Sequence, residues 1–317
     1  MTINTKVVGR LAPSPTGAQH LGNARTYLIA WLSARSQGGR MVLRIEDIDA
    51  SRVRSGAIES AIDDLRWLDL HWDGEPIVQT QRVNAHRDAV DRLKALEIVY
   101  PCTCTRSDIE RAASAPHAEN EGPIYPGLCA HRRASDAESL APRPFAWRMR
   151  TTNEAIPFVD GLRGLVALNL HQIGGDFVVW KNDDSPAYQL AVVVDDADAG
   201  VTEVIRGDDL IPSTPRQLLL YRALGHDAPK FVHVPLVIDE DGRRLAKRYG
   251  DTRLSLLREA GVAPEAVLGL LAWSCGWIDE VVPIRSVDLL GRYRLDAIPR
   301  EPFVLTREIL TKIGFPA

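Results

Sequence analysis

The chain lacks any run of about 18 apolar residues, so its sequence predicts no transmembrane helix. Its first six residues, MTINTK, are mostly polar and do not fit a secretory signal peptide. Internal repeats and extended low-complexity tracts are also missing. We therefore expect a globular, cytoplasmic protein with no membrane partner.

An excess of basic charge is missing as well. The chain has 38 basic and 42 acidic residues, which gives a formal net charge of −4. This excludes a uniformly basic nucleic-acid-binding protein, although a local basic patch would be enough to bind RNA. The composition is otherwise ordinary, with 45% hydrophobic and 25% charged residues, and 317 residues can form two or three domains.

Cysteine is scarce, and three of the four cysteines lie close together in the sequence at Cys102, Cys104 and Cys129. Without a secretion signal, a metal site is favoured over a disulfide framework. Tetrahedral zinc would need a fourth ligand beside these three thiolates. The alternative is three buried cysteines with no metal. Cys275 lies in an apolar helical pattern and is expected in the core.

Residues 10–23 read RLAPSPTGAQHLGN and lead from a short apolar stretch into a helical pattern. Gly22 lets the backbone approach a ligand closely, and a helix start offers free N–H groups and a positive dipole end to phosphate. His20 could donate a hydrogen bond to a phosphate oxygen there. Taken alone, the segment also fits an ordinary turn before a helix with a solvated histidine.

Much later in the chain, residues 244–248 read RLAKR. Lys247 could neutralise charge on the same phosphates, although a basic run by itself is usually a solvated charge cluster. Together, and in this order, the two segments indicate the two halves of one ATP site.

Residues 43–49 read LRIEDID, an alternation that predicts a strand ending in an acidic cluster. Placing Glu46, Asp47 and Asp49 together is electrostatically costly without a cationic partner. Ligands bind at the carboxyl ends of strands in open α/β sheets, so Glu46 would suit an ammonium group there.

Four segments together resemble the class I glutamyl-tRNA synthetases: residues 10–23, 44–49, 193–196 with 204–209, and 244–248. HLGN stands where that family has its HIGH-type motif. RLAKR stands where it has KMSKS, with Ala246 in the place of a serine. The resemblance spans residues 7–255 and implies that Mg-ATP activates glutamate to glutamyl-adenylate and pyrophosphate.

The part of the chain after the RLAKR segment is short, running only from 255 to 317. This is too little for the anticodon-binding domain of a full glutamyl-tRNA synthetase. The shortened form resembles the glutamyl-Q tRNA(Asp) synthetases, which attach glutamate to the queuosine base of tRNA(Asp). The resemblance thus implies ATP, L-glutamate and queuosine-bearing tRNA(Asp) as partners of a monomer that activates glutamate without tRNA.

The resemblance also implies a set of site residues. Glutamate would be bound by Arg10, Leu11, Ala12, Pro13, Ser14, Glu46, Tyr188 and Arg206. ATP would be bound by His20, Gly22, Asn23 and Lys247, with His20 and Lys247 as the catalytic pair. The chemistry agrees, because two arginines can bind carboxylates and Glu46 can pair with the ammonium group. For Arg206, the alternative is a salt bridge to Asp208 or Asp209.

For the cysteine cluster, the resemblance implies one structural zinc ion and two candidates for its fourth ligand. Tyr125 occupies the position of a tyrosine ligand in the glutamyl-Q family. His131 completes the Cys-x-Cys…Cys-x-His pattern of zinc-bearing glutamyl-tRNA synthetases. Imidazole is the more common zinc donor, whereas a phenol must first lose a proton of pKa about 10.

We expect an α/β fold with a Rossmann-type parallel sheet, an inserted zinc-bearing α+β module and a short C-terminal helical appendage. The expected boundaries are 1–100 and 186–254 for the two halves of the catalytic domain, 101–185 for the insertion, and 255–317 for the appendage. Strands are expected at 7–8, 41–45, 145–150, 165–170, 176–180, 188–194 and 231–238. Helices are expected at 23–36, 55–70 and 81–97, and from 213 and 264 onward. In the helix near 213, Ser213 and Thr214 are expected to form the cap, with Pro215 at the first helical position. Several arginines of the insertion could face RNA or solvent, and none is assigned: Arg132, Arg133, Arg143, Arg148 and Arg150.

Two other functions remain open at this point. One is a truncated glutamyl-tRNA synthetase that charges a tRNA 3′ end. The other is a non-catalytic RNA-binding paralogue, against which the retained His20, Glu46, Arg206 and Lys247 argue.

Overall fold

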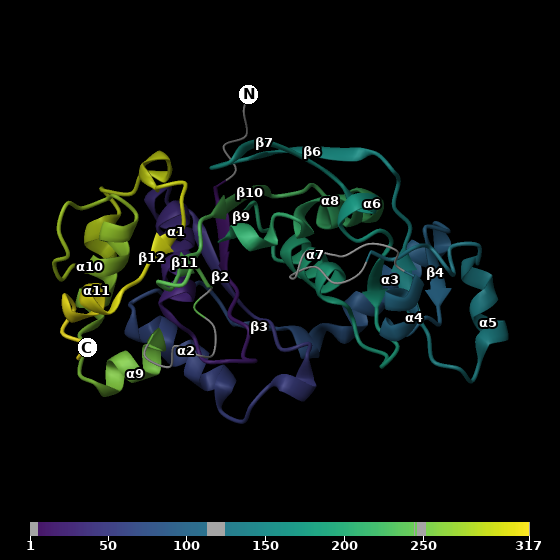
Figure 1. Cartoon of the computed structure of the whole chain (residues 1–317), viewed down its shortest axis with the longest axis horizontal. Helices are drawn as coiled ribbons and strands as arrows, with labels where there is room; N and C mark the ends of the chain where they lie inside the picture. The colour runs from purple at the N-terminus through teal and green to yellow at the C-terminus, as the bar shows by residue number, and fades with distance from the viewer. Residues whose placement is uncertain (1–5, 113–123, 244, 246–251, 317) are drawn as a thin grey trace.

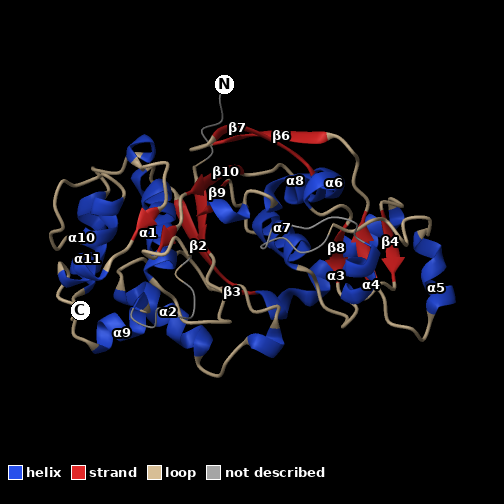
Figure 2. Ribbon diagram, in the orientation of Figure 1, coloured by secondary structure: helices blue, strands red, loops and turns tan. Residues whose placement is uncertain are grey.

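The computed structural model describes residues 6–112, 124–243, 245 and 252–316. Over these residues, no helix combines the length and the apolar character that crossing a membrane requires. The molecule is elongated, with the parallel strands near its middle, the cysteine-bearing segment at one end and the C-terminal helices at the other (Figure 1). Helices surround the central strands on several sides (Figure 2).

The first α/β unit contains three parallel strands. Its elements are β1 (Val8–Leu11), α1 (Leu21–Ser36), β2 (Arg40–Ile45), α2 (Ala57–Trp67), β3 (Ile77–Val78) and α3 (Val83–Ala95). β2 lies between β1 and β3 and pairs in parallel with both. The expected strands and helices of this unit are confirmed within a few residues. Because the strands are covered on both faces, β2 is buried from Met41 to Ile45.

The second α/β unit lies beside the first. Its elements are α7 (Tyr188–Asp198), β9 (Glu203–Gly207), α8 (Ser213–Leu224), β10 (Lys230–Val234) and β11 (Val237–Ile238). β9 and β10 are parallel, and the Thr202 N–H donates to the Val8 carbonyl at 2.9 Å, which places β9 beside β1. The spatial order is therefore β3-β2-β1-β9-β10. Such an order reverses direction between β1 and β9, and a crevice is expected at the carboxyl ends of these two strands.

Three expectations in this unit were wrong. Residues 188–194 form most of helix α7 rather than a strand, because a short run that is buried almost all round has no period to separate helix from strand. Helix α8 begins at Ser213, so Pro215 lies two residues inside it instead of at its first position. The expected strand 231–238 is two strands, β10 and β11, and β11 pairs with the C-terminal β12 (Phe303–Val304).

The segment between the two units is built differently. Its elements are β4 (Val99–Cys102), α4 (Arg106–Ala112), α5 (Ala137–Leu140), β5 (Ala146–Met149), β6 (Ala155–Asp160), β7 (Gly164–Asn169), α6 (Leu170–Ile173) and β8 (Phe177–Trp180). β4, β5 and β8 form an antiparallel sheet, and β6 with β7 forms a long hairpin. The strands expected at 145–150, 165–170 and 176–180 are confirmed, whereas β6 was missed. In Figure 1 the hairpin passes above β10 and α8.

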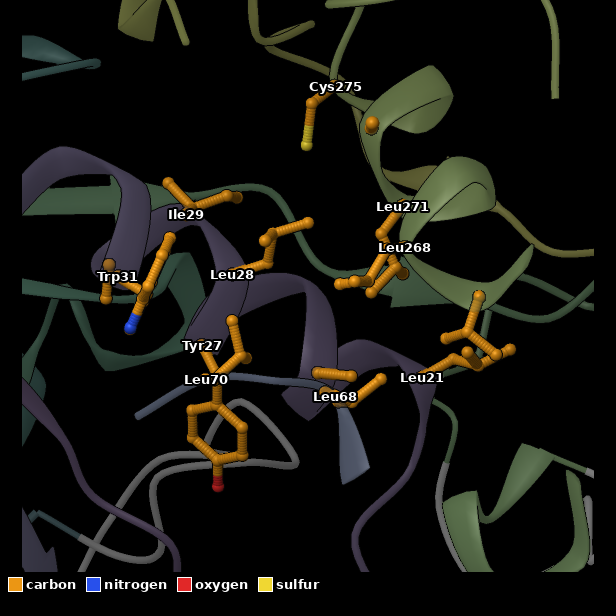
Figure 3. Packing of buried hydrophobic residues seen from close by; sticks show 14 of the residues in the cluster. Leu21, Tyr27, Leu28, Ile29, Trp31, Leu68, Leu70, Leu268, Leu271 and Cys275 are labelled. Atoms are coloured by element: carbon orange, nitrogen blue, oxygen red, sulfur yellow. The ribbon is translucent and has the colours of Figure 1, made fainter. Parts of the chain in front are cut away.

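The C-terminal part packs on the first unit through α1. Its helices are α9 (Leu254–Glu259), α10 (Pro264–Ser274) and α11 (Arg307–Thr311). Leu28 on α1 points toward Leu268 and Leu271 on α10, and all three are buried in one apolar cluster (Figure 3). Cys275 lies at the end of α10 and is fully buried, which confirms its expected place in the core. Arg25 on α1 also donates to the Pro235 carbonyl at 2.8 Å, so a buried cation ties the helix to the second unit.

Candidate active site

A cavity of about 340 Å³ lies where the carboxyl ends of β1 and β9 meet the start of α1. The residues that line it include eight of the sequence-predicted ones: Arg10, Ala12, His20, Gly22, Asn23, Glu46, Tyr188 and Arg206. They come from β1, α1, the end of β2, α7 and β9. Sheet order brings these distant segments to one crevice, as the topology requires.

Three further predicted residues stand behind the cavity wall. Leu11 is fully buried in the apolar core. The Pro13 carbonyl accepts from the Glu46 N–H at 3.0 Å, and the Ser14 hydroxyl donates to the Glu46 carbonyl at 3.4 Å. These contacts fix the backbone of Glu46 at the end of β2.

The second half of the expected ATP site is described only in part. Ala246 and Lys247 lie outside the described residues. Leu245 is described and lines the cavity. On the far side of this segment, the Leu254 N–H donates to the Gln19 carbonyl at 2.9 Å, and Arg253 forms a β-bridge with His20. The chain on both sides of Lys247 is therefore held at the HLGN motif.

His20 is the N-cap of α1. Its Nδ1 accepts from the Gly22 N–H at 3.1 Å, and its own backbone N–H donates to the Asn23 side chain at 3.1 Å. A Cβ on residue 22 would lie 2.9 Å from His20 Cε1, so glycine is required for this cap. In the neutral ring the proton is then on Nε2, which makes this nitrogen a hydrogen-bond donor.

The acidic end of β2 has the cationic partner that electrostatics demands, and sequence reasoning missed it. Arg44 donates to Glu46 at 2.9 Å and also pairs with Asp196 on α7. Asp196 lies 3.7 Å from Arg10 in turn. Burial alone would lower the pKa of Arg44, but Asp196 and Glu46 together raise it, so this cation stays charged. Residues 44 and 46 share one face of a strand, and that spacing was the available signal.

The other two acids of the cluster have separate partners. Asp47 accepts from the Thr80 N–H at 2.9 Å and from its hydroxyl at 2.6 Å. Asp49 lies 3.3 Å from Arg52 at the surface. Of the three acids, only Glu46 lines the cavity.

Arg206 is buried and is held by neutral acceptors. Its Nε donates to His233 at 3.0 Å, one terminal nitrogen donates to Gln217 at 2.9 Å, and the other donates to Thr214 at 2.9 Å. Burial lowers the pKa of Arg206, and nearby Arg10 adds to the effect. Because these partners are neutral, Arg206 has no ion-pair partner within the part of the chain that the structure describes, and this favours an anionic ligand. Asp208, one of the two alternative partners, pairs with Arg163 instead at 2.5 Å.

Two tyrosines form apolar and polar parts of the wall. Tyr188, at the start of α7, was predicted as a site residue, whereas Tyr27 on α1 was not. The Tyr27 hydroxyl donates to Gln19 at 2.7 Å. Burial, followed by the charge of Glu46, raises the pKa of both hydroxyls, so both stay neutral. Tyr27 lies one helical turn from Asn23, and this spacing could have revealed it.

Cys102, Cys104 and Cys129 meet at the far end of the molecule, where their sulfur atoms all lie within 4.8 Å of one another. Zn–S bonds of about 2.3 Å in a tetrahedron place sulfur atoms about 3.8 Å apart, so the cluster fits a zinc ion. The Tyr125 oxygen lies 3.4 Å from the Cys102 sulfur and accepts from the Cys129 N–H at 2.8 Å.

The geometry favours Tyr125 over His131 as the fourth ligand. His131 is exposed, whereas Tyr125 is buried in the same small cluster as the thiols. Burial and then the Cys102 contact raise the pKa of the Tyr125 hydroxyl, and burial likewise raises the pKa of Cys104 to about 12. Deprotonation of these groups therefore requires the charge of a metal ion.

A larger cavity of about 1580 Å³ separates the cysteine cluster from the parallel sheet. Its wall includes Cys102, Cys104 and Tyr125 on one side and Asp209, Leu210 and Leu236 on the other. The last three residues line the smaller cavity as well. The two cavities are therefore neighbours across a shared wall.

Comparison with known proteins gives the family. Residues 6–282 match the family described as tRNA synthetases class I (E and Q), catalytic domain. A glutamyl-Q tRNA(Asp) synthetase of Rhodopirellula baltica is 51% identical over 95% of this chain and 97% of that protein. The glutamyl-Q tRNA(Asp) synthetase of Symbiobacterium thermophilum is 48% identical over 96% of this chain and 98% of that protein.

Longer relatives also match. The glutamate–tRNA ligase of Geobacter sulfurreducens is 39% identical over 95% of this chain and 64% of the ligase. The crystal structure of a glutamate tRNA ligase from Elizabethkingia meningosepticum, in complex with its amino acid, superposes with a TM-score of 0.82. Its sequence identity is 27%, and the match covers 96% of this chain and 68% of that one.

Proposed function

Because the chain belongs to the catalytic-domain family of the class I tRNA synthetases for glutamate and glutamine, enzymes of the ligase type, we propose that it activates L-glutamate with ATP and passes it to the queuosine base of tRNA(Asp). Activation would not need tRNA. The observation that carries the proposal is the convergence of Arg10, Glu46 and Arg206 on one cavity with His20 at its edge.

Glutamate has two carboxylates and one ammonium group, and the charges of the cavity complement them. Arg10 and Arg206 would bind carboxylates, while Glu46 would pair with the ammonium group. Arg44 and Asp196 would hold Arg10 and Glu46 in place. Tyr188 would pack against the aliphatic part of the substrate.

In the first step, a glutamate α-carboxylate oxygen attacks the α-phosphorus of ATP, and the bond to the pyrophosphate oxygen breaks. No protein nucleophile is needed, so positioning and charge stabilisation must supply the rate. His20 Nε2 would donate to a phosphate oxygen at the positive end of α1, beside Gly22 and Asn23. Lys247 would neutralise charge on the same phosphates. Mg²⁺ accompanies the ATP.

In the second step, a hydroxyl of the queuosine base would attack the adenylate carbonyl, releasing AMP. The support for this acceptor is that four relatives named glutamyl-Q tRNA(Asp) synthetase are 43–51% identical to this chain. Three relatives named glutamate–tRNA ligase are 39–40% identical to it. The RNA would enter through the larger cavity, whose wall adjoins the smaller one.

We also propose one structural zinc ion bound by Cys102, Cys104, Cys129 and Tyr125. Zinc would stabilise the end of the insertion that faces the larger cavity and would take no part in the chemistry. The division into catalytic halves 1–100 and 186–254, insertion 101–185 and appendage 255–317 is part of the same proposal.

The test has two parts. Glutamate-dependent exchange of pyrophosphate into ATP is measured first with no RNA present, and we expect exchange. Labelled glutamate is then offered to a queuosine-containing anticodon stem–loop of tRNA(Asp), which has no 3′ CCA end. The matched control is the same stem–loop with guanosine in place of queuosine.

Transfer to the first stem–loop and none to the second is the expected result. Exchange that requires RNA, or labelling only of intact tRNA at its 3′ end, would instead support a glutamyl-tRNA synthetase. No exchange and no transfer under any of these conditions would leave a non-catalytic RNA-binding protein.

A further inference from the structure

Behind Arg206 lies a pair of buried side chains to which the proposed reaction gives no role. His233 on β10 is the direct cross-strand neighbour of Arg206 on β9. Its Nε2 accepts from the Arg206 Nε at 3.0 Å, and its Nδ1 lies 2.7 Å from a carboxylate oxygen of Asp160. Both His233 and Asp160 are buried, with 0% and 2% of their surfaces exposed.

Asp160 is itself anchored by backbone donors. Its carboxylate accepts from the N–H groups of Leu162 and Arg163 at 2.9 and 2.8 Å, and from the His233 N–H at 3.0 Å. Burial alone would raise the pKa of Asp160, but these bonds and His233 lower it. The anion is therefore fixed at the end of β6, where the long hairpin crosses β10 (Figure 1).

The hydrogen bonds determine the proton arrangement of His233. Arg206 has only donors, so the His233 Nε2 must present its lone pair to it. Thr214 accepts from Arg206, and its hydroxyl lies 3.2 Å from the same Nε2, where it donates its own proton. The ring proton is consequently on Nδ1, facing Asp160. Burial lowers the pKa of His233, and Arg206 lowers it further, in keeping with a neutral ring.

Aromatic packing holds the same two side chains. The His233 ring stacks on Phe231 with centroids 6.2 Å apart and 10° between planes. The Arg206 guanidinium carbon lies 5.1 Å from the Phe231 ring centroid. Phe158 on β6 meets the His233 ring edge-on at 6.3 Å. His233 can therefore neither tilt nor flip without losing one of these contacts.

We propose that Asp160 and His233 are positioning residues, which fix the guanidinium plane of Arg206. Four of its five N–H groups donate to His233, Gln217, Thr214 and the Leu210 carbonyl, and the fixed plane would aim the remaining N–H at the carboxylate of glutamate. The inference rests on the proposed function, because it takes Arg206 to be a glutamate-binding residue. It adds that the β6–β7 hairpin, which lies outside the parallel sheet, sets the affinity for the amino acid. ATP binding should be unaffected, because the capping bonds of His20 lie at the start of α1, whereas the bonds of this pair join β6 to β10 and β9.

The experiment compares two substitutions of one residue. His233→Phe keeps the packing of the ring and removes both nitrogen atoms. His233→Gln keeps a carbonyl acceptor for Arg206 and an N–H donor for Asp160. We expect His233→Phe to raise the KM for glutamate in pyrophosphate exchange about 10- to 100-fold, the range for a lost hydrogen bond to a charged group. The KM for ATP and the kcat should stay within about threefold.

His233→Gln should recover most of the glutamate affinity, and Asp160→Asn should give an intermediate loss. Val159→Ala is the matched control, because Val159 precedes Asp160 on the same strand and is 74% exposed. It should behave like the wild type. Thermal unfolding of every variant identifies any that fails to fold. If His233→Phe does not fold, the KM for glutamate is compared between His233→Gln and Asp160→Asn instead.

The outcomes separate the two claims. If the wild type exchanges pyrophosphate with glutamate and folded His233→Phe has an unchanged KM for glutamate, the positioning role is overturned and the proposed function stands. Equal rises in the KM for glutamate and for ATP would also overturn it, because they would indicate general distortion. If the wild type neither binds nor activates glutamate, the proposed function fails, and the positioning role fails with it.

Discussion

The cavity at the parallel sheet and the cysteine cluster at the far end of the molecule are assembled in opposite ways. Arg10, Glu46, Tyr188 and Arg206 come from strands and helices spread over most of the chain. Cys102, Cys104, Tyr125 and Cys129 lie within one stretch of the insertion. One site depends on the sheet order of the whole molecule, and the other on a local loop arrangement.

The two sites also treat charge differently. Among the described residues of the cavity at the sheet, each buried charge except that of Arg206 has a partner of opposite sign, as in the Arg10, Asp196, Arg44 and Glu46 series. In the cysteine cluster, Arg148 donates to the Cys102 sulfur at 3.3 Å, and a metal ion would supply the rest of the compensating charge. Amino-acid activation and zinc binding should therefore be separable by mutation, and four predictions test this.

The largest effect is expected for Arg206→Ala. This substitution removes the buried cation that is left uncompensated for a substrate carboxylate, a loss of about 3–5 kcal/mol. Glutamate-dependent pyrophosphate exchange should fall by more than about 100-fold, while circular dichroism still reports the native fold. The control is Arg222→Ala, because Arg222 lies on α8 in the same α/β unit as Arg206 and is exposed. Unchanged exchange in Arg206→Ala would remove this residue from the site.

The next effect is expected for Cys102→Ser. Loss of one of three thiolates should remove zinc from the purified protein and lower its thermal stability, since metal-binding energy is folding energy for such a cluster. Transfer to the queuosine stem–loop should be lost, while pyrophosphate exchange stays within about threefold of the wild type. Zinc is measured by mass spectrometry. Cys275→Ala, outside the cluster, should keep its zinc. A metal-free wild type would contradict the zinc proposal.

A smaller effect separates the two candidate fourth ligands. Tyr125→Phe removes only a hydroxyl and should weaken zinc binding by at least about 10-fold in competition with a chromophoric chelator. His131→Ala should bind zinc like the wild type, because the imidazole is exposed at the surface. The opposite result, with His131→Ala weakened and Tyr125→Phe unchanged, would assign the imidazole. Glutamate activation should be the same in both variants.

The smallest effect concerns Asp64 on α2, which belongs to neither site. Its Oδ1 has no hydrogen-bond partner among the described residues, and the nearest cation, Arg258, is 3.9 Å away. Burial raises the pKa of Asp64 to about 6, above its unfolded value of about 3.8. A raised carboxyl pKa favours the protonated fold, so the ionised group destabilises the protein fully above pH 6 and not below the unfolded value.

Asp64→Asn should therefore raise the melting temperature by about 2–4 °C at pH 8 and leave it unchanged at pH 4. The zinc content and the KM for glutamate of this variant should match those of the wild type, because Asp64 belongs to neither site. Scanning calorimetry at the two pH values is the measurement. An equal rise at pH 4 would show that the gain comes from packing rather than from removal of a buried charge.

The sequence was most informative where a motif and its structural context are local. HLGN predicts the start of α1 because a cap, a glycine and an apolar helical period occur together, and the structure has them there. The acidic cluster at the end of β2 was recognised from the electrostatic repulsion among its carboxylates. Its partner Arg44, two residues before Glu46, was overlooked. Local pattern thus located the site and left its internal pairing undetermined.

The sequence was least informative where a segment is buried on all sides, because its hydrophobic residues then show no periodicity. Residues 188–194 were expected to form a strand, and α7 is buried over most of its length, so tertiary packing decides its conformation. His233 and Asp160 could not be found from sequence at all, since their contact with Arg206 depends on the register of β9 with β10 and on the path of a hairpin. Such contacts are set by the fold and leave no trace in local spacing.

The wall that the two cavities share has one more consequence. Asp209, Leu210 and Leu236 line both cavities, so the two spaces adjoin at these residues. A mixed anhydride between a carboxylate and a phosphate is readily lost to water. With its acceptor admitted to the adjoining cavity, the activated acyl group would be used before it could diffuse out of the protein. Waste of ATP would then be limited by geometry already present in the folded chain.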